Sequence, residues 1–237
     1  MLYPDPPVAL GQTKPALQII PLDSLSCPSI ESFAVVEERT IHSHVTNEQP
    51  ADYQIQQDIK AILFADVVGF STLAEKQMPL FNKHFLGAAA DLVSASTFKP
   101  VAVNAWGNGF YMVFDEVDQA GRFALELRRF LQPPPKGVAD WGRHGLPADL
   151  GIRIALHAGP VFSMFNPLIN HVVFVGGHMN LAAALESITN KGEIFSTEHY
   201  AVLAATSSTN YFCEYIGQRS LPTDPIGMKV YRLIEAE

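Results

Sequence analysis

The chain has 237 residues, of which 48% are hydrophobic and 17% charged, which predicts a folded domain with a substantial core and argues against overall disorder. Its formal net charge of -8 gives no electrostatic support for a nucleic-acid partner or an anionic membrane surface. The two cysteines show no zinc or disulfide pattern, the N-terminus lacks a signal peptide, and no apolar run approaches the ~18 residues of a membrane span. We therefore expect a cytoplasmic protein with no nucleic-acid or membrane partner.

Residues 1–55 differ from the rest of the chain because they are rich in proline and show little sustained periodicity. Within them, residues 16–22 (ALQIIPL) and 32–42 (SFAVVEERTIH) have the composition of short edge strands. We interpret residues 1–55 as an N-terminal arm that packs on the main domain or on a partner; a tail without fixed structure is the alternative. Residues 56–237 then form the main domain.

From residue 58 onward the hydrophobic pattern becomes regular. Residues 60–66 (KAILFAD) predict a short buried strand, and the apolar spacing over 78–96 predicts a helix. Residues 101–115 predict a hairpin, and residues 117–132 predict a second helix that ends at consecutive prolines. The later elements are a loop over 133–146, strands at 150–162 and 171–175, a helix at 176–189, a strand at 192–197, a helix at 198–205, and a strand pair at 212–221 and 228–235. This order predicts an α+β sandwich with helices on a largely antiparallel sheet.

Asp66 lies where the first buried strand leaves the core, and a glycine-containing turn follows it directly. A carboxylate there is a hard oxygen ligand suited to Mg²⁺ or Mn²⁺. The backbone N–H groups of Val68, Gly69, Phe70 and Ser71, at the start of a predicted helix, could hold phosphate oxygens. From the spacing alone, an Asp66 that only caps the next helix is the simpler alternative.

Two other glycine-containing segments are equally ambiguous. Gly107-Asn108-Gly109 carries the Asn-Gly pair of a tight hairpin turn, and a plain turn explains it without any ligand. The segment GGHMN, residues 176–180, could present backbone N–H groups to an anion or could form a simple strand-to-helix bend. The histidines show no metal-ligand spacing, so the sequence predicts no role for them in a metal site.

Five segments, taken in their order along the chain, indicate a function more specifically than any one of them does alone. These segments are ILFADVVGFSTL, NAWGNGFYMVF, IRIALHAGPVF, GGHMNLAAALESIT and GEIFST. Together they resemble the catalytic domain of class III nucleotidyl cyclases, from about residue 58 to the C-terminus. The Trp before the hairpin glycine, the LHAGPVF segment and the CEY strand look closest to bacterial pyrimidine cyclases, which make cyclic UMP or cyclic CMP in antiphage signalling.

The resemblance implies a ferredoxin-like fold, a head-to-tail homodimer and two active sites at its interface. In that family two Asp residues bind two metal ions, Mg²⁺ or Mn²⁺, which hold the triphosphate and activate the ribose 3′-hydroxyl for attack on the α-phosphate. Asp66 matches the first Asp, Val67 the residue whose carbonyl assists, and Asn108 the second Asp. Asn180 matches the ribose-orienting Asn of the opposite subunit, and Ala184 stands at the position of the family's transition-state Arg.

Four positions depart from the pattern of active adenylyl cyclases. Asn108 keeps the shape of Asp but lacks its charge, and Ala184 lacks a guanidinium whose counterpart in other phosphoryl-transfer enzymes is worth about 10³–10⁵ in rate. Asn104 stands where adenylyl cyclases have Lys, and Val173 where they have Asp. The resemblance therefore predicts a base pocket that accepts UTP or CTP rather than ATP.

Three explanations of these departures remain open. In the first, the chain is an active enzyme whose missing groups are supplied by other residues, such as Arg153, Arg219 or Lys229. In the second, it is a pseudocyclase that acts as a non-catalytic nucleotide-binding or scaffolding module. In the third, it is a copy of an active cyclase in which Asp and Arg were replaced at positions 108 and 184.

Overall fold

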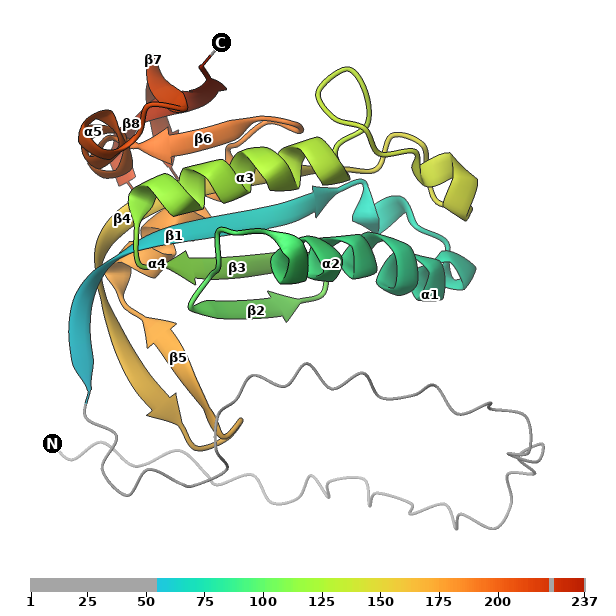
Figure 1. Cartoon of the computed structure of the whole chain (residues 1–237), viewed down its shortest axis with the longest axis horizontal. Helices are drawn as coiled ribbons and strands as arrows, with labels where there is room; N and C mark the ends of the chain where they lie inside the picture. Colours follow the sequence, from blue (N-terminus) through green and yellow to red (C-terminus); the bar gives the residue numbers. More distant parts are fainter. Residues whose placement is uncertain (1–54, 222–223, 237) are drawn as a thin grey trace, which may run out of the picture. The chain divides into compact units, whose positions relative to one another are not determined.

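The computed structural model describes residues 55–221 and 224–236 (Figure 1). The edge strands predicted at 16–22 and 32–42, and almost all of the predicted arm, lie outside these residues. The first described element is strand β1, Gln56–Val68.

An eight-stranded sheet forms the centre of the described domain, with the strand order β2-β3-β1-β4-β6-β8-β7 and with β5 paired to β4 (Figure 1). The other strands are β2 (Ala102–Trp106), β3 (Gly109–Phe114), β4 (Gly151–Asn166), β5 (His171–Val175), β6 (Ile194–Thr197), β7 (Tyr211–Leu221) and β8 (Asp224–Glu235). Every paired neighbour is antiparallel except β4 and β6. The order β2-β3-β1-β4 with its intervening helices is ferredoxin-like, so the predicted α+β class is confirmed.

The helices are α1 (Met78–Leu80), α2 (Gly87–Ala95), α3 (Val117–Leu131), α4 (Gly177–Ser187) and α5 (Glu198–Ser207). The single helix predicted over 78–96 is interrupted by the π-helical segment η4, Phe81–Leu86. Helix α3 ends one residue before the prolines that follow Gln132, as predicted. Within the described residues, no helix is both long and apolar enough to cross a membrane.

The burial of both faces of β1 explains why its sequence is a continuous apolar run rather than an alternating one. Ala61, Leu63 and Ala65 belong to the core beneath α2, α3 and α5, whereas Ile62 and Phe64 belong to a second core that includes α4. Because successive side chains of a strand point to opposite faces, both faces of β1 are buried. Figure 1 shows α2 and α3 across one face of the sheet and α4 behind it.

The predicted loop over 133–146 contains a short 3₁₀ helix, Trp141–His144, that the sequence pattern did not indicate. Trp141 is buried, and its indole N–H donates to the carbonyl of Leu131 at 3.2 Å. The indole therefore fastens the loop to the end of α3 and satisfies one of the carbonyls left open where that helix stops.

Candidate functional site

Asp66 lies near the end of β1, opposite Gly109 of β3 and Arg153 of β4. Its Oδ2 accepts a hydrogen bond from Nη2 of Arg153 at 2.9 Å, and its Oδ1 accepts one from Nδ2 of Asn108. The residue that caps the short helix after β1 is Gly69, without a side-chain hydrogen bond. Asp66 is therefore not a helix cap, and its carboxylate instead links β1 to Arg153 of β4 and to Asn108 at the tip of the β2–β3 hairpin.

The turn after β1 depends on a glycine. Gly69 has a φ of +99°, a conformation that residues with a Cβ rarely adopt, and it leads into the 3₁₀ helix Phe70–Thr72. The backbone N–H of Thr72 bonds back to the Gly69 carbonyl at 3.2 Å. Within the described backbone, the N–H groups of Phe70 and Ser71 make no hydrogen bond, so they remain available to an oxygen ligand.

The β2–β3 hairpin holds Asn108 over Asp66. Gly107, the first central residue of the turn, has a φ of +57°, whereas Asn108 at the second does not, which is the pattern of a type II′ turn. The carbonyl of Asn108 accepts the backbone N–H of Val67 at 3.1 Å. This backbone contact fixes the hairpin tip against β1, so that the Asn108 amide faces the Asp66 carboxylate.

A cleft of about 270 Å³ opens at this point of the sheet. The residues that line it are Asp66, Val67, Val68, Gly69, Phe70, Ser71, Asn108 and Arg153. Seven of these are site residues predicted from the sequence. The cleft thus gathers every predicted metal-ligand and phosphate-binding residue, and it adds Arg153.

The remaining predicted residues lie outside this cleft. Asn104 is on β2, with its Nδ2 3.5 Å from the hydroxyl of Tyr111, and Val173 is on β5. Asn180 and Ala184 are on α4 and do not line the cleft. The prediction assigns Asn180 and Ala184 to a site completed by a second subunit, and this dimer stays a prediction.

Arg153 lines the cleft, but the local sequence reasoning did not place it there. Its guanidinium bridges Asp66 and Glu186 of α4, and Nη1 also lies 3.4 Å from the carbonyl of Ser187. Burial raises the pKa of the Glu186 carboxyl, the Asp66 charge raises it further, and Arg153 opposes both. Arg153 is one of the three cationic residues that the sequence analysis named as able to supply the groups missing at positions 108 and 184. Another of the three, Lys229, is paired with Glu198 at 2.7 Å.

Replacing Arg153 by Gln is expected to lower the free energy of unfolding by about 1–2 kcal/mol at pH 7, because Asp66 and Glu186 would then repel each other without the guanidinium between them. Urea unfolding at pH 7 measures the change. The control is Arg143→Gln, whose ion pair with Asp140 is exposed and is expected to contribute little. Equal losses for the two variants would contradict this role of Arg153.

The oxygen donors at the cleft fit one divalent cation completed by a ligand. Asp66 offers a carboxylate, Val67 a backbone carbonyl, and Asn108 a side-chain oxygen once its amide rotates. Within residues 55–221 and 224–236, no three His, Cys, Asp or Glu side chains are grouped to hold a metal ion. Mg²⁺ is commonly bound through one or two carboxylates together with substrate phosphates, so this donor set suits a metal that arrives with a triphosphate.

Residues 53–235 match the family model of the adenylate and guanylate cyclase catalytic domain. The chain belongs to this class III cyclase family. The predicted family is therefore confirmed.

Solved structures of cyclases share the fold. The adenylyl cyclase CyaB from P. aeruginosa aligns with a TM-score of 0.66 and 18% identity over 78% of this chain and 97% of that one. The guanylate cyclase domain of RhGC from Catenaria anguillulae, solved in complex with GTP, aligns with a TM-score of 0.62 and 19% identity over 77% and 100% of the two chains. At these identities the likeness shows the fold alone.

A curated relative carries a different name. A protein of Acanthamoeba polyphaga mimivirus, named as a serine/threonine-protein kinase/receptor (R826), is 27% identical over 118 residues. The match covers 45% of this chain and 7% of that protein. The chain thus corresponds to a small part of a much longer relative.

Proposed function

We propose that the chain binds a nucleoside triphosphate with Mg²⁺ or Mn²⁺ at the Asp66 cleft and converts it to the 3′,5′-cyclic monophosphate and pyrophosphate. The observation that supports this best is the side-by-side arrangement of one carboxylate, one amide and one guanidinium at the Gly69 turn. A carboxylate attracts a cation, while a guanidinium and free backbone N–H groups attract phosphate oxygens.

Each residue of the cleft has a role in this proposal. Asp66, the Val67 carbonyl and the Asn108 amide oxygen hold the cation, which when bound supplies charge neutralisation of the triphosphate and acidifies the ribose hydroxyl. Arg153 leaves Asp66 to bind phosphate oxygens in a bidentate manner once the cation takes its place beside the carboxylate. The N–H groups of residues 68–71 hold further phosphate oxygens. Asp66 thereby keeps a charged partner throughout.

The reaction needs a second copy of the chain, in a homodimer with two equivalent sites. Asn180 of α4 orients the ribose, so that its 3′-oxygen forms a bond to the α-phosphorus while the bond to pyrophosphate breaks and the hydroxyl proton is released. Ala184 offers no positive charge to this transition state. We therefore propose slow turnover, with Arg153 supplying part of the missing charge.

UTP or CTP, rather than ATP, is the proposed substrate. Asn104 and Val173 replace the Lys and Asp that stand at these positions in adenylyl cyclases. The Asn104 amide both donates and accepts hydrogen bonds and lies beside the Tyr111 hydroxyl, which suits a pyrimidine edge carrying donors and acceptors. The product would then be cyclic UMP or cyclic CMP, with a role in antiphage signalling as in the bacterial pyrimidine cyclases that the sequence resembles.

A non-catalytic nucleotide-binding or scaffolding module is the second candidate function. One observation favours it: both oxygens of Asp66 already accept hydrogen bonds, from Asn108 and Arg153 of the same chain. With Ala184 also lacking charge, the chain could hold a triphosphate without transforming it.

Incubation of the full chain with ATP, GTP, CTP and UTP in separate reactions with Mn²⁺, followed by mass spectrometry, separates these functions. Cyclic product from UTP or CTP supports the cyclase. Saturable triphosphate binding without product supports the second candidate. If no triphosphate binds, the cyclase and the nucleotide-binding module are both wrong, and a scaffolding role is favoured.

Asp66→Ala is expected to abolish the gain in triphosphate affinity that Mn²⁺ gives, an effect of at least about tenfold, because the cation loses its only protein carboxylate in the cleft. Isothermal titration calorimetry with and without Mn²⁺ measures this difference. The control is Asp115→Ala, which removes a carboxylate that is more than half exposed and paired with Lys60. A Mn²⁺ effect that survives in Asp66→Ala would remove Asp66 from the metal site.

A further inference from the structure

Three histidines that are distant in sequence lie together on the side of the domain where β4, α4 and α5 meet. The rings of His157 and His178 are stacked with centroids 5.0 Å apart, and His199 lies edge-on to His157 at 5.5 Å. His157 is fully buried in β4. None of the three lines the Asp66 cleft, so the cluster is separate from the site described above.

A directed chain of hydrogen bonds runs through these histidines. Thr197 caps α5 by accepting the backbone N–H of Tyr200, and its Oγ1 lies 2.8 Å from Nδ1 of His157. The Thr197 hydroxyl is buried, and Nδ1 of His157 is the only acceptor that the described residues offer it, so the hydroxyl donates there. His157 must then carry its proton on Nε2, which lies 2.7 Å from Nδ1 of His178.

It follows that Nδ1 of His178 is an acceptor and that the neutral ring of His178 carries its proton on Nε2. This Nε2–H has no hydrogen-bond acceptor among the described residues. Burial lowers the pKa of His178, and the neighbouring His199 lowers it further, which keeps the ring neutral near pH 7. The Nε2–H of His178 is therefore a hydrogen-bond donor for which the described residues provide no acceptor.

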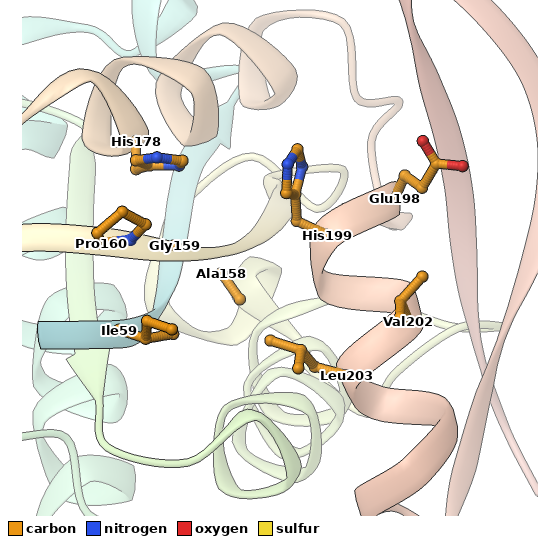
Figure 2. A pocket seen from close by; sticks show the side chains of 9 residues that line it. All are labelled: Ile59, Ala158, Gly159, Pro160, His178, Glu198, His199, Val202 and Leu203. Atoms are coloured by element: carbon orange, nitrogen blue, oxygen red, sulfur yellow. The ribbon is translucent and has the colours of Figure 1, made fainter.

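The donor stands at the edge of a pocket of about 410 Å³, within the size range of small-molecule sites (Figure 2). The pocket is lined by Ile59, Ala158, Gly159, Pro160, His178, Glu198, His199, Val202 and Leu203. Figure 2 shows the two imidazoles on one side of the pocket and the apolar side chains of Ile59 and Leu203 on the other. Glu198 is paired with Lys229, so it adds no unpaired charge to the lining.

Gly159 makes room for the imidazole of His178. A Cβ at residue 159 would lie 2.2 Å from Nδ1 of that ring, closer than atoms can approach. The position of His178 thus depends on a glycine of β4 as well as on its bond to His157, and the donor is held in place before any ligand arrives.

We propose that this pocket binds a small, neutral, mostly apolar molecule whose carbonyl or hydroxyl oxygen accepts the Nε2–H of His178. The apolar walls provide a place for the hydrocarbon part, and the imidazole provides its one directional contact. A charged ligand fits less well, because the pocket offers no unpaired cation to compensate for the loss of hydration. This site does not depend on the proposed cyclase activity.

The test uses the full chain and the dye prodan, a neutral naphthyl ketone whose emission moves to shorter wavelength in an apolar site. Saturable binding with such a shift is expected for the unmodified chain. His178→Phe keeps the ring and removes the donor, so binding should weaken about tenfold, the effect of one hydrogen bond. Val202→Asp, at an exposed helix position, should also weaken binding at least tenfold because it places a charge at the apolar wall.

Val138→Asp is the matched control, because Val138 and Val202 are 62% and 60% exposed and Val138 does not line the pocket. Prodan binding to Val138→Asp and to Asp66→Ala should equal that of the unmodified chain. Absence of saturable binding, or equal binding to Val202→Asp, overturns the proposed site. Equal binding to His178→Phe in a folded variant overturns the role of the imidazole donor.

Discussion

The double variant Asn108→Asp with Ala184→Arg is expected to form cyclic nucleotide on the order of 10³-fold faster than the unmodified chain. An arginine that neutralises charge in a phosphoryl-transfer transition state is worth about 10³–10⁵ in rate, and Ala184 occupies the position that the family assigns to this group. Asn108→Asp adds the second anionic ligand that the cleft lacks.

The structure gives a physical reason for the first half of this effect. Nδ2 of Asn108 donates to Oδ1 of Asp66, so an Asp at position 108 would place two carboxylates in contact. Two carboxylates in contact repel each other unless a cation or a proton lies between them. Asn108→Asp alone should therefore bind Mn²⁺ more tightly than the unmodified chain and should become more stable to heat when Mn²⁺ is added.

A control variant is needed to show that the effect depends on the position of the new arginine and not only on its charge. Asn108→Asp combined with Ser187→Arg has the same net charge, with the new guanidinium on an exposed position of α4 about one turn further along. Mass spectrometry with each of the four triphosphates and Mn²⁺ measures product formation in both double variants. If Asn108→Asp with Ala184→Arg binds a triphosphate but makes no cyclic product from any base, the proposal of a cyclase fails.

Much of the fold could be predicted because its signals are local. The apolar run of β1, the glycine turn between β2 and β3, and the prolines after α3 each act on their own neighbourhood. The burial of Trp141 could not be predicted in this way, because it depends on a carbonyl at the end of α3 that the loop reaches only in three dimensions.

The residues of the candidate site likewise fall into those that the sequence indicates and those that only the three-dimensional fold brings together. Asp66 and the turn that follows are contiguous, and the family resemblance added Asn108 from the next hairpin. Arg153 joins them only because β4 pairs with β1 in a register that sets Asp66 opposite Arg153, 87 residues apart. One signal was present in the sequence: Arg153 is the only charged residue in an otherwise apolar strand segment, and such a charge usually has a partner.

The histidine cluster could not be predicted from the spacing of histidines along the sequence. His157 and His199 are far apart in sequence, and they meet because β6 lies parallel to β4 with Ser196 beside Leu156. A parallel pairing that follows a long crossover leaves no short-range pattern. Histidines without metal-ligand spacing can therefore still lie together in the folded domain.

Removing His157 is expected to abolish a large part of the acid sensitivity of the fold. Burial, together with the charges of His178 and His199, lowers the pKa of His157 from 6.5 to about 3. Because the unfolded chain then binds the proton more tightly than the folded one, the stabilisation is complete above pH 6.5 and is lost as the pH falls toward 3. At about 1.4 kcal/mol per pH unit, the loss at pH 5 is roughly 2 kcal/mol.

Urea unfolding of the full chain at pH 7 and pH 5 tests this. His157→Gln should be less stable than the unmodified chain at pH 7, since Thr197 and His178 lose their partner, yet it should lose about 2 kcal/mol less between pH 7 and pH 5. His171→Gln, which replaces an exposed histidine of β5, should keep the full pH dependence of the unmodified chain. An equal decline in His157→Gln and His171→Gln would show that His157 is protonated as readily in the folded chain as in the unfolded one, and the buried hydrogen-bond chain from Thr197 to His178 would then have to be abandoned.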